Sequence, residues 1–335
     1  MMRAATAARG TSRIRARRNA IILGLLLALG GGPALAEQAV TYLLPAPSFL
    51  PAFAPWMLAK ERGYYRAEGL NVDFEIGKGG ADVAKQVGIG NAVLGGGMGD
   101  TPIIVRANGV PVKAVAVLGG GGLMQLVFHA DSPIRTPADL KGKTVTVSSY
   151  QETTYYALLG MLAHDGLTRS DVDIEAAGAT NVWKLFLAGK ADAMAAVPDW
   201  IVDVEKAGAR VKVIPSEDYF PSMAQAVLAS DTAVKQNGAM IRGFVRATLR
   251  GMHDMMSDPD GAARDYVKAV PERAGQEVAM AQVFRLYDKY VYRRRDRLGE
   301  MDAKRFSALQ DFYLKEGIIQ KTTPVADLFT NQFVR

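Results

Sequence analysis

The chain has 335 residues, of which 49% are hydrophobic, so it is long enough to form two lobes with cores of their own. The formal net charge of +6 arises entirely from arginines in the first 36 residues, and the neutral remainder excludes an electrostatic argument for a nucleic-acid partner. Cysteine is absent, which excludes disulfides and a lipid anchor on a cysteine beside a cleavage site.

The first 36 residues have the pattern of an export signal. An arginine-rich start leads into an apolar run from Ala20 to Leu29 and then into the small-x-small ending Ala34-Leu35-Ala36. We expect cleavage near Ala36 and a periplasmic location for the mature chain. Arg17-Arg18 leaves twin-arginine export open beside the general route. No later segment is apolar over the about 18 residues that a bilayer-spanning helix needs.

Strands and helices alternate through the first part of the mature chain. Helices are expected to begin at Pro55, Ala81 and Thr101. Proline can open the helix at Pro55, a glycine turn precedes Ala81, and Thr101 is a capping residue followed by proline. The predicted strands are residues 39–44, 72–76, 92–95, 112–118 and 126–128. This alternation predicts an α/β protein with a mostly parallel sheet.

The second part repeats the alternation and then becomes helical. Predicted strands are residues 144–147, 172–175, 191–197 and 211–214, and predicted helices are 153–164, 181–188 and 199–207. Residues 224–229 are strand-like, and the segments 239–256, 259–269, 275–294 and 302–316 are predicted helices. The pattern predicts lobe I from residues 37–130 and 224–335 and an inserted lobe II from residues 131–223. Hinges are expected near Ala130 and Ala224.

The stretch from Thr136 to Leu162 is the most ligand-like part of the chain. Thr136, Pro137 and Asp139 have the spacing of a capped helical turn, and a short β-branched strand follows. A polar loop then precedes a helix that Gly166 can end. At the carboxyl end of a strand in an open α/β sheet, such a loop directs free N–H groups of the helix start into a crevice. We therefore expect ligand contacts from Ser148, Ser149, Tyr150, Gln151, Glu152 and Thr153.

Six short motifs carry a resemblance to a known family. They are PWMLAKERGYY at 55–65, EGLNV at 68–72, GDTP at 99–102, PVK at 111–113, PADLKGK at 137–143 and GKADA at 189–193. In this order they resemble the periplasmic substrate-binding proteins of ABC importers for nitrate, sulfonates, taurine and thiamine-pyrimidine precursors, over nearly all of the mature chain. The resemblance implies a type II periplasmic-binding-protein fold, with two lobes, a cleft and a hinge, that delivers a small ligand to an ABC permease in the inner membrane.

In the first lobe, the turn from Gly97 to Pro102 is expected to approach a ligand. Its glycines let the backbone come close, and Thr101 and Asp100 stand at a helix start, although a plain capped turn has the same pattern. Lys78 is the one obvious cation among the cleft loops. Phe49 can contact a ligand or pack in the core, as can Phe53 and Trp56; the helical period favours the core for Trp56.

The second lobe departs from the family at its polar loop. Where the family commonly has glycine followed by serine or threonine, this chain has Gln151 and Glu152, and a carboxylate there would repel a small inorganic anion. Glu152 can equally face solvent. Asp199 and Trp200 follow Pro198, with acid and proline swapped relative to the family, and Trp200 can stack on a planar ligand or be half-buried. Asn181 is expected to cap its helix and to face the cleft.

The sequence has little that favours catalysis. His129, His164 and His253 share no metal spacing, Gly142-Lys143-Thr144 lacks the earlier glycine of a phosphate loop, and Gly119–Gly122 suits a flexible crossing near the hinge. Related chains that synthesise the thiamine pyrimidine are cytosolic and use a cysteine-rich motif, which this chain lacks. We therefore predict a monomeric solute-binding protein without catalytic residues, metal or cofactor. Its ligand would be an organosulfonate or an aromatic or heterocyclic nitrogenous compound; an exported enzyme and a ligand-sensing protein are the alternatives.

Overall fold

The structure is a computed structural model that describes residues 37–150, 152–292 and 297–334. The expected export signal and its cleavage site lie outside the described residues, as does Gln151. In the part of the chain that is described, none of the helices is both long and apolar enough to cross a membrane.

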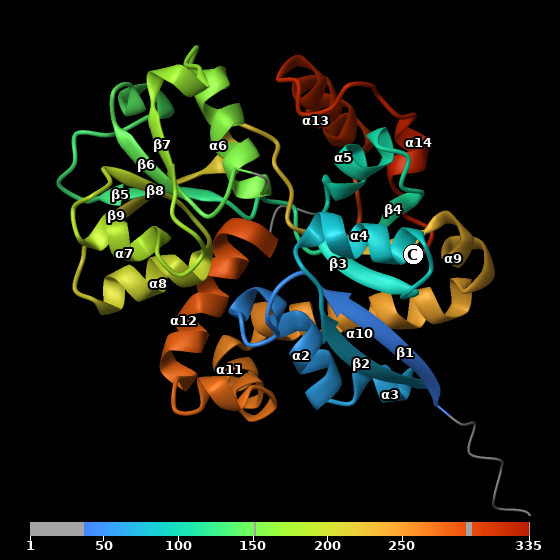
Figure 1. The fold of residues 1–335 in the computed structure, drawn as a ribbon. Helices are drawn as coiled ribbons and strands as arrows, with labels where there is room; N and C mark the ends of the chain where they lie inside the picture. The colour runs from blue at the N-terminus through green and yellow to red at the C-terminus, as the bar shows by residue number, and fades with distance from the viewer. Residues whose placement is uncertain (1–36, 151, 293–296, 335) are drawn as a thin grey trace, which may run out of the picture. The chain divides into compact units, whose positions relative to one another are not determined.

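The first sheet joins segments from distant parts of the chain. Its strands, in spatial order, are β2 (Leu70–Ile76), β1 (Gln38–Leu44), β3 (Leu94–Met98), β10 (Gln225–Ser230) and β4 (Val112–Val117). Strand β1 pairs in parallel with β2 and β3, whereas β10 runs antiparallel between β3 and β4 (Figure 1). The sheet is mixed, but β1, β2, β3 and β4 run in the same direction, so the expected mostly parallel sheet is confirmed apart from β10, with which the chain returns in the opposite direction.

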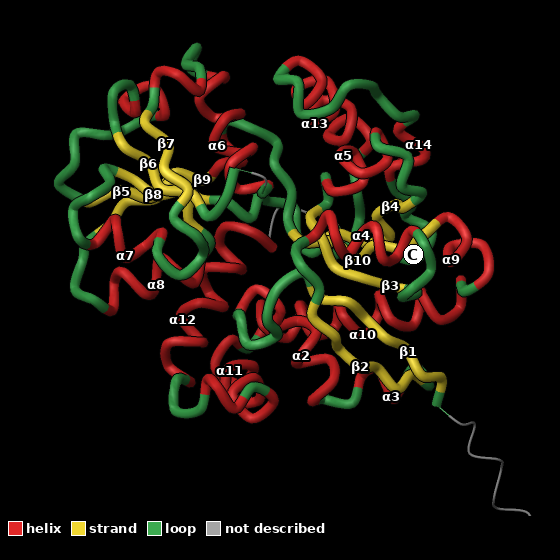
Figure 2. The backbone as a smooth tube through the Cα atoms, viewed as in Figure 1, coloured by secondary structure: helices red, strands yellow, loops and turns green. Residues whose placement is uncertain are grey.

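The second sheet is also mixed. Its spatial order is β7 (Asp173–Ala176), β6 (Thr144–Val147), β8 (Ala193–Ala196), β5 (Gln125–His129) and β9 (Val211–Pro215). Strand β6 pairs in parallel with β7 and β8, and β5 runs antiparallel to both β8 and β9 (Figure 2).

Strand β5 corrects one expectation. The sequence pattern placed the strand at residues 126–128 at the end of lobe I, but it hydrogen-bonds within the second sheet. The backbone therefore passes between the sheets between Val117 and Gln125, ahead of Ala130, because the glycine-rich stretch from Gly119 to Gly122 supplies an extended connection. The return passage lies between Pro215 and Gln225, near the expected Ala224. The assignment of the helices to two lobes stays a prediction.

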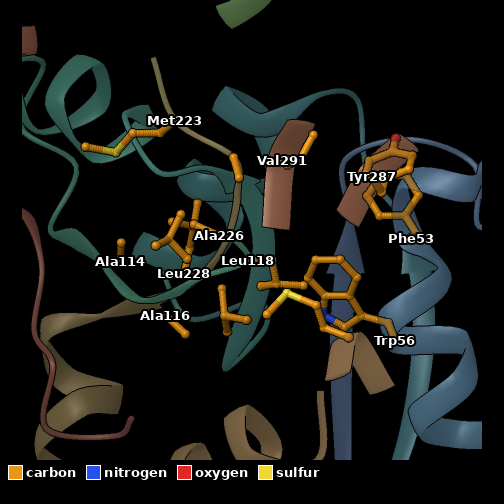
Figure 3. Close-up of a cluster of buried hydrophobic side chains, with 14 of the residues drawn as sticks. Phe53, Trp56, Ala114, Ala116, Leu118, Met223, Ala226, Leu228, Tyr287 and Val291 are labelled. Carbon is orange, nitrogen blue, oxygen red and sulfur yellow. The ribbon is translucent and has the colours of Figure 1, made fainter. Parts of the chain in front are cut away.

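Two apolar clusters form the core. Leu126 and Phe128 of β5 belong to a large cluster that extends to the first sheet, whereas Val127 belongs to a smaller one that contains Trp200. Alternate residues of a strand point to opposite faces, so β5 is buried on both sides, as its uninterrupted apolar run requires. Figure 3 shows part of the large cluster, in which Leu118 and Trp56 lie together.

Helices and helical turns fill the connections. Those before β6 are η1 (Pro51–Phe53), α2 (Ala54–Glu61), α3 (Tyr64–Ala67), α4 (Gly80–Gly88), α5 (Thr101–Ala107) and η2 (Pro137–Leu140). Those between β6 and β10 are α6 (Thr153–His164), η3 (Arg169–Asp171), α7 (Val182–Leu187), α8 (Pro198–Lys206) and η4 (Ser216–Asp218). Helix α6 has the predicted bounds, and Gly166 beyond it has φ 77°. In η2, Thr136 and Asp139 form the expected capping box, in which the Asp139 carboxylate accepts a hydrogen bond from the Thr136 N–H.

The helical C-terminal part is confirmed, with one interruption. It comprises α9 (Asp231–Gln236), α10 (Gly238–Ser257), α11 (Pro259–Ala269), η5 (Pro271–Arg273), α12 (Glu277–Tyr287), η6 (Asp288–Tyr292), α13 (Ala303–Lys315) and α14 (Val325–Leu328). Where one helix was expected over residues 275–294, α12 passes into a π-helical turn, η6. Its Val291 carbonyl accepts a hydrogen bond of 2.9 Å from the N–H of Gly121, so this turn packs against the first passage between the sheets.

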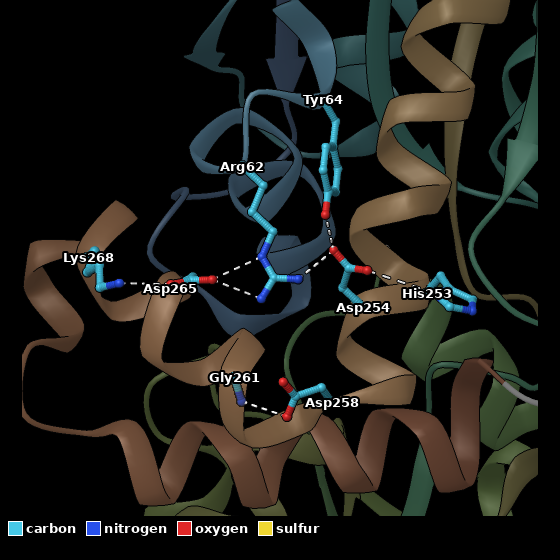
Figure 4. Close-up of polar contacts among 8 residues, drawn as sticks. All are labelled: Arg62, Tyr64, His253, Asp254, Asp258, Gly261, Asp265 and Lys268. Carbon is cyan, nitrogen blue, oxygen red and sulfur yellow. Dashed lines mark hydrogen bonds and ion pairs between the residues drawn. The ribbon is translucent and has the colours of Figure 1, made fainter. Parts of the chain in front are cut away.

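A network around Arg62 joins the end of α2 to two helices of this part, α10 and α11. From the end of α2, its guanidinium donates to Asp254 of α10 at 2.5 Å and to Asp265 of α11 at 2.9 Å (Figure 4). The Tyr64 hydroxyl also donates to Asp254, at 2.5 Å. These partly buried contacts tie α10 and α11 to the end of α2.

Replacing Gly121 with alanine should lower the free energy of unfolding by about 2–4 kcal/mol. A Cβ there would clash with the carbonyl oxygen of Tyr290, a backbone atom that cannot move away without shifting η6. Chemical denaturation followed by circular dichroism measures the change. Gly238→Ala is the matched control, because the nearest atom to its added Cβ is 3.7 Å away. Equal stabilities of the two variants would contradict the close packing of this passage.

Candidate functional site

The loops at the carboxyl ends of the strands hold most of the predicted ligand residues. Loops after β1, β2 and β3 carry Phe49, Lys78 and Asp100, and loops after β6 and β8 lead to Ser148 and Asp199. In α/β sheets these ends are where ligands usually bind. The structure places Asp100 and Asp199 in two separate polar clusters.

The first is the Asp100 cluster, formed by Asp100, Tyr156 and Tyr313. Asp100 ends the turn after β3, is 0% exposed, and accepts a hydrogen bond from the Tyr313 hydroxyl of α13. The Tyr313 ring lies 5.6 Å from the ring of Tyr156 on α6. Burial, and then the negative charge of Asp100, raise the pKa of both tyrosines, so both hydroxyls keep their protons. The cluster therefore joins a carboxylate of the first sheet to aromatic donors from two helices.

Thr101 lies beside this cluster and has a structural bond of its own. Its hydroxyl accepts a hydrogen bond of 2.9 Å from the N–H of Met98, which closes the turn, and the residue is 6% exposed. A Cβ on Gly97 would lie 2.9 Å from the same hydroxyl oxygen, so the turn requires glycine there. The expectation that this turn approaches a ligand stays a prediction.

The polar loop after β6 stands at the start of α6. Ser148 is buried, Ser149 is half-buried, and Glu152 precedes the first helical residue, Thr153, whose side chain is outside what the structure describes. Glu152 is exposed when its whole surface is considered, but its carboxyl group is partly shielded from water. This loss of hydration raises the pKa of the carboxyl, and a hydrogen bond with Ser148 opposes the rise. Thr154 is 7% exposed, and its hydroxyl has no hydrogen-bond partner among the described residues.

Tyr150 points its hydroxyl toward the second sheet. That hydroxyl donates to the Ile174 carbonyl of β7 at 2.9 Å, and the Arg169 guanidinium lies 5.7 Å from the ring. The ring is 5.4 Å from that of Tyr155, which lies 5.8 Å from Tyr156. A row of tyrosines therefore runs from this loop to the Asp100 cluster.

The second cluster is the Asp199 cluster, formed by Asp199, Tyr266, Arg273 and Tyr287. Asp199 of α8 is 8% exposed and accepts a hydrogen bond of 3.2 Å from the Tyr287 hydroxyl of α12. Burial raises the pKa of Asp199 to about 6, although Tyr287 and the charge of Arg273 oppose the rise. Tyr266 and Arg273 both donate to the backbone carbonyl of Phe49, at 2.9 and 3.0 Å.

Several expectations need correction. Trp200 is 9% exposed within the second apolar cluster, so its ring is a core ring, and Phe53, for which ligand contact and core packing were both open, is 5% exposed. Trp56 is a core residue as expected. Asn181 precedes α7, but its exposed side chain makes no capping hydrogen bond. These side chains depend on which face of an element meets the core, which local spacing does not specify.

Phe49 and Lys78 contact residues other than those of the Asp100 cluster. Phe49 is 36% exposed, with the Arg273 guanidinium 5.9 Å from its ring. Lys78 is exposed, and its backbone N–H donates to Asp82. A hollow of about 260 Å³ lies elsewhere, along the second half of α6 and the end of α13, where Leu159 and Lys315 are among its lining residues. It contains none of the predicted ligand residues.

The sequence reasoning missed Thr154, Tyr156 and Tyr313. Thr154 and Tyr156 are in the helix after the predicted loop, and the helical period of Thr153–Leu162 could have placed one face of that helix toward the site. Tyr313 is 213 residues from Asp100 in the chain, and its segment has no feature that distinguishes it from other amphipathic helices.

Comparison with known proteins agrees with this architecture. Residues 50–262 match the family described as NMT1/THI5 like. The riboflavin-binding protein RibY from Chloroflexus aurantiacus is 26% identical over 312 residues, 89% of this chain and 88% of that one. A formylaminopyrimidine-binding protein from Halalkalibacterium halodurans is 27% identical, covering 61% of this chain and 63% of that one. A 4-amino-5-hydroxymethyl-2-methylpyrimidine phosphate synthase from Aspergillus parasiticus is 24% identical, covering 66% and 68%.

A solved structure shows the same fold. The periplasmic aliphatic sulphonate binding protein SsuA from Escherichia coli superposes with a TM-score of 0.70 at 18% identity, covering 87% of this chain and 91% of that one. The α/β periplasmic-binding-protein fold with extra C-terminal helices is thereby confirmed. Because the family match extends over more than half of its residues, this chain belongs to the NMT1/THI5-like family.

Proposed function

We propose that this protein binds a small planar organic compound with hydrogen-bond donors, in the periplasm, and delivers it to an ABC permease. The Asp100 cluster carries the proposal, because it places a buried carboxylate beside tyrosine rings from α6 and α13. A carboxylate accepts hydrogen bonds from N–H and O–H groups, and aromatic rings pack on flat ligands. Relatives named as riboflavin- and formylaminopyrimidine-binding proteins support the same class of ligand.

The carboxyls weigh against a simple inorganic anion. Asp100 lies in the turn after β3, and Glu152 lies at the start of α6. A negatively charged ligand between these two places would be repelled by both carboxylates. An organosulfonate is the competing ligand class: its charged end would lie at the N–H groups of α6 and its organic part along the tyrosines. Export, the permease partner and a monomeric state are further parts of this proposal.

Calorimetric titration of the mature chain with riboflavin, formylaminopyrimidine and hexanesulfonate tests the ligand class. We expect one of the two planar compounds to bind and Asp100→Asn to weaken that binding about 10- to 100-fold, since a hydrogen bond to a charged acceptor is lost. Asp302→Asn is the matched control, because Asp302 is an exposed N-cap residue of α13 and asparagine also caps helices. Binding of hexanesulfonate alone, or equal affinities of the two variants, would refute the proposal.

A second candidate function is favoured by the relatives named as synthases. An enzyme would convert the compound that it binds, whereas a binding protein releases it unchanged. The absence of cysteine favours binding, since the related synthases are expected to use a cysteine-rich motif that this chain lacks. Mass spectrometry of the compound after incubation with purified protein separates the two functions, and uptake measured after deletion of the permease separates transport from sensing.

A further inference from the structure

Two buried glutamines occupy equivalent places in the two sheets. Gln225 is the first residue of β10 and lies opposite Met98, the last residue of β3. Gln125 is the first residue of β5 and lies opposite Ala196, the last residue of β8. Both strands begin where the chain has just passed between the sheets. Each glutamine therefore lies at the carboxyl end of the strand that leads to Asp100 or to Asp199.

The amide nitrogens of both side chains are held by backbone. Nε2 of Gln225 donates to the Ala52 carbonyl at 2.8 Å, and Nε2 of Gln125 donates to the Gly122 carbonyl at 3.0 Å. A carbonyl can only accept, so the nitrogen of each amide must lie there, which fixes the position of the oxygen as well. Each Oε1 is thus a hydrogen-bond acceptor in a set position.

Neither oxygen has a donor among the described residues. Oε1 of both glutamines is buried without a hydrogen-bond partner, and the two residues are 1% and 4% exposed. A buried acceptor without a donor destabilises a fold, so an apolar side chain would suit these positions better if they served packing alone. Buried polar groups of this kind are the means by which a site rejects a ligand that lacks the matching donor.

We propose that Gln125 and Gln225 determine ligand specificity by accepting hydrogen bonds from N–H or O–H groups of the bound planar compound, one from each sheet. This inference rests on the proposed function and deepens it, because it assigns acceptors that recognise donors on the ring system itself. Asp100 contributes a charged acceptor in the first lobe, and the glutamines contribute neutral acceptors beside the passages between the sheets. The ligand class that follows is a planar heterocycle with an imide or amino group.

Paired probes test the assignment. Riboflavin is compared with 3-methylriboflavin, and 4-amino-2-methylpyrimidine with 4-(dimethylamino)-2-methylpyrimidine, because each analogue keeps the ring and loses the donor. For the full mature chain we expect the donor-bearing member of one pair to bind about tenfold or more tightly than its analogue. In Gln125→Met or Gln225→Met this preference should fall to about threefold or less, since methionine has a similar shape and no acceptor.

The thermal midpoints of the ligand-free variants complete the test. Because each substitution removes an unpartnered oxygen along with the amide's one hydrogen bond in Gln225 or two in Gln125, both variants should unfold within about 5 °C of the parent. A loss of about 10 °C or more in both variants would show that the glutamines are structural. A preference that survives both substitutions would overturn the inference while leaving the proposed function intact. No binding of any probe by the parent chain would overturn the proposed function and the inference with it.

Discussion

Arg305→Met is expected to lower the free energy of unfolding by about 3–5 kcal/mol. The Arg305 guanidinium, on α13, donates to the Gly120 carbonyl at 2.7 Å and to the Pro221 carbonyl at 3.0 Å, and it also donates to the carbonyl of Ser222. It forms an ion pair with Glu217, and the two side chains are 10% and 19% exposed. One cation thus holds both passages between the sheets, residues 118–124 and 216–224. Removing it leaves a largely buried carboxylate and several carbonyls without this donor.

The measurement is denaturant unfolding of Arg305→Met, Glu217→Gln and the double variant. If the pair is coupled, the double variant should lose less stability than the sum of the two single variants. Arg242→Met is the matched control, since Arg242 is exposed and its one backbone hydrogen bond is 3.5 Å long; its loss should stay within about 0.5 kcal/mol. The role assigned to Arg305 is wrong if its variant is no less stable than the control.

Asp199→Asn should raise the free energy of unfolding above pH 6 by about 1–3 kcal/mol. The pKa of Asp199 is about 6 in the folded chain and about 3.9 in an unfolded chain. Between those values the folded chain holds a proton that the unfolded chain has released, so the stability falls as the pH rises through this window. Above pH 6 the folded chain carries a buried charge. Asparagine carries none and can still accept the hydrogen bond from Tyr287.

Unfolding curves from pH 4 to pH 8 measure this difference. Groups that face Asp199 include Asp203 on its own helix and Arg273, Tyr266, Tyr287 and Tyr292 from the C-terminal part. The parent chain should lose stability from about pH 4 to pH 6 relative to Asp199→Asn. Asp131→Asn, at an exposed position, should follow the parent curve. If the free energies of unfolding of the parent and of Asp199→Asn differ by the same amount at every pH, burial does not shift the pKa of Asp199.

Local signals in the sequence determined several elements. The sequence predicted α11 with its observed bounds, Pro259–Ala269, and the polar loop before Thr153 with Gly166 beyond His164 predicted α6. Proline at a helix start and glycine after a helix end act through their own backbone angles and through hydrogen bonds to close neighbours in the chain. Such interactions have the same meaning in any tertiary context, so they could be recognised without one. The resemblance in six motifs likewise predicted the fold class correctly.

The tertiary structure alone decided how these elements meet. Strand β5 has an apolar run that suits either sheet, and only its hydrogen bonds to β8 and β9 assign it to the second. The bond from Tyr313 to Asp100 spans 213 residues, and Trp200 is a core residue because its face of α8 meets the second apolar cluster. Pairing partners and helix faces are selected by the burial of the whole chain, whose energy is distributed over many distant contacts. The sequence therefore determined where the candidate loops begin, and packing determined which side chains they bring together.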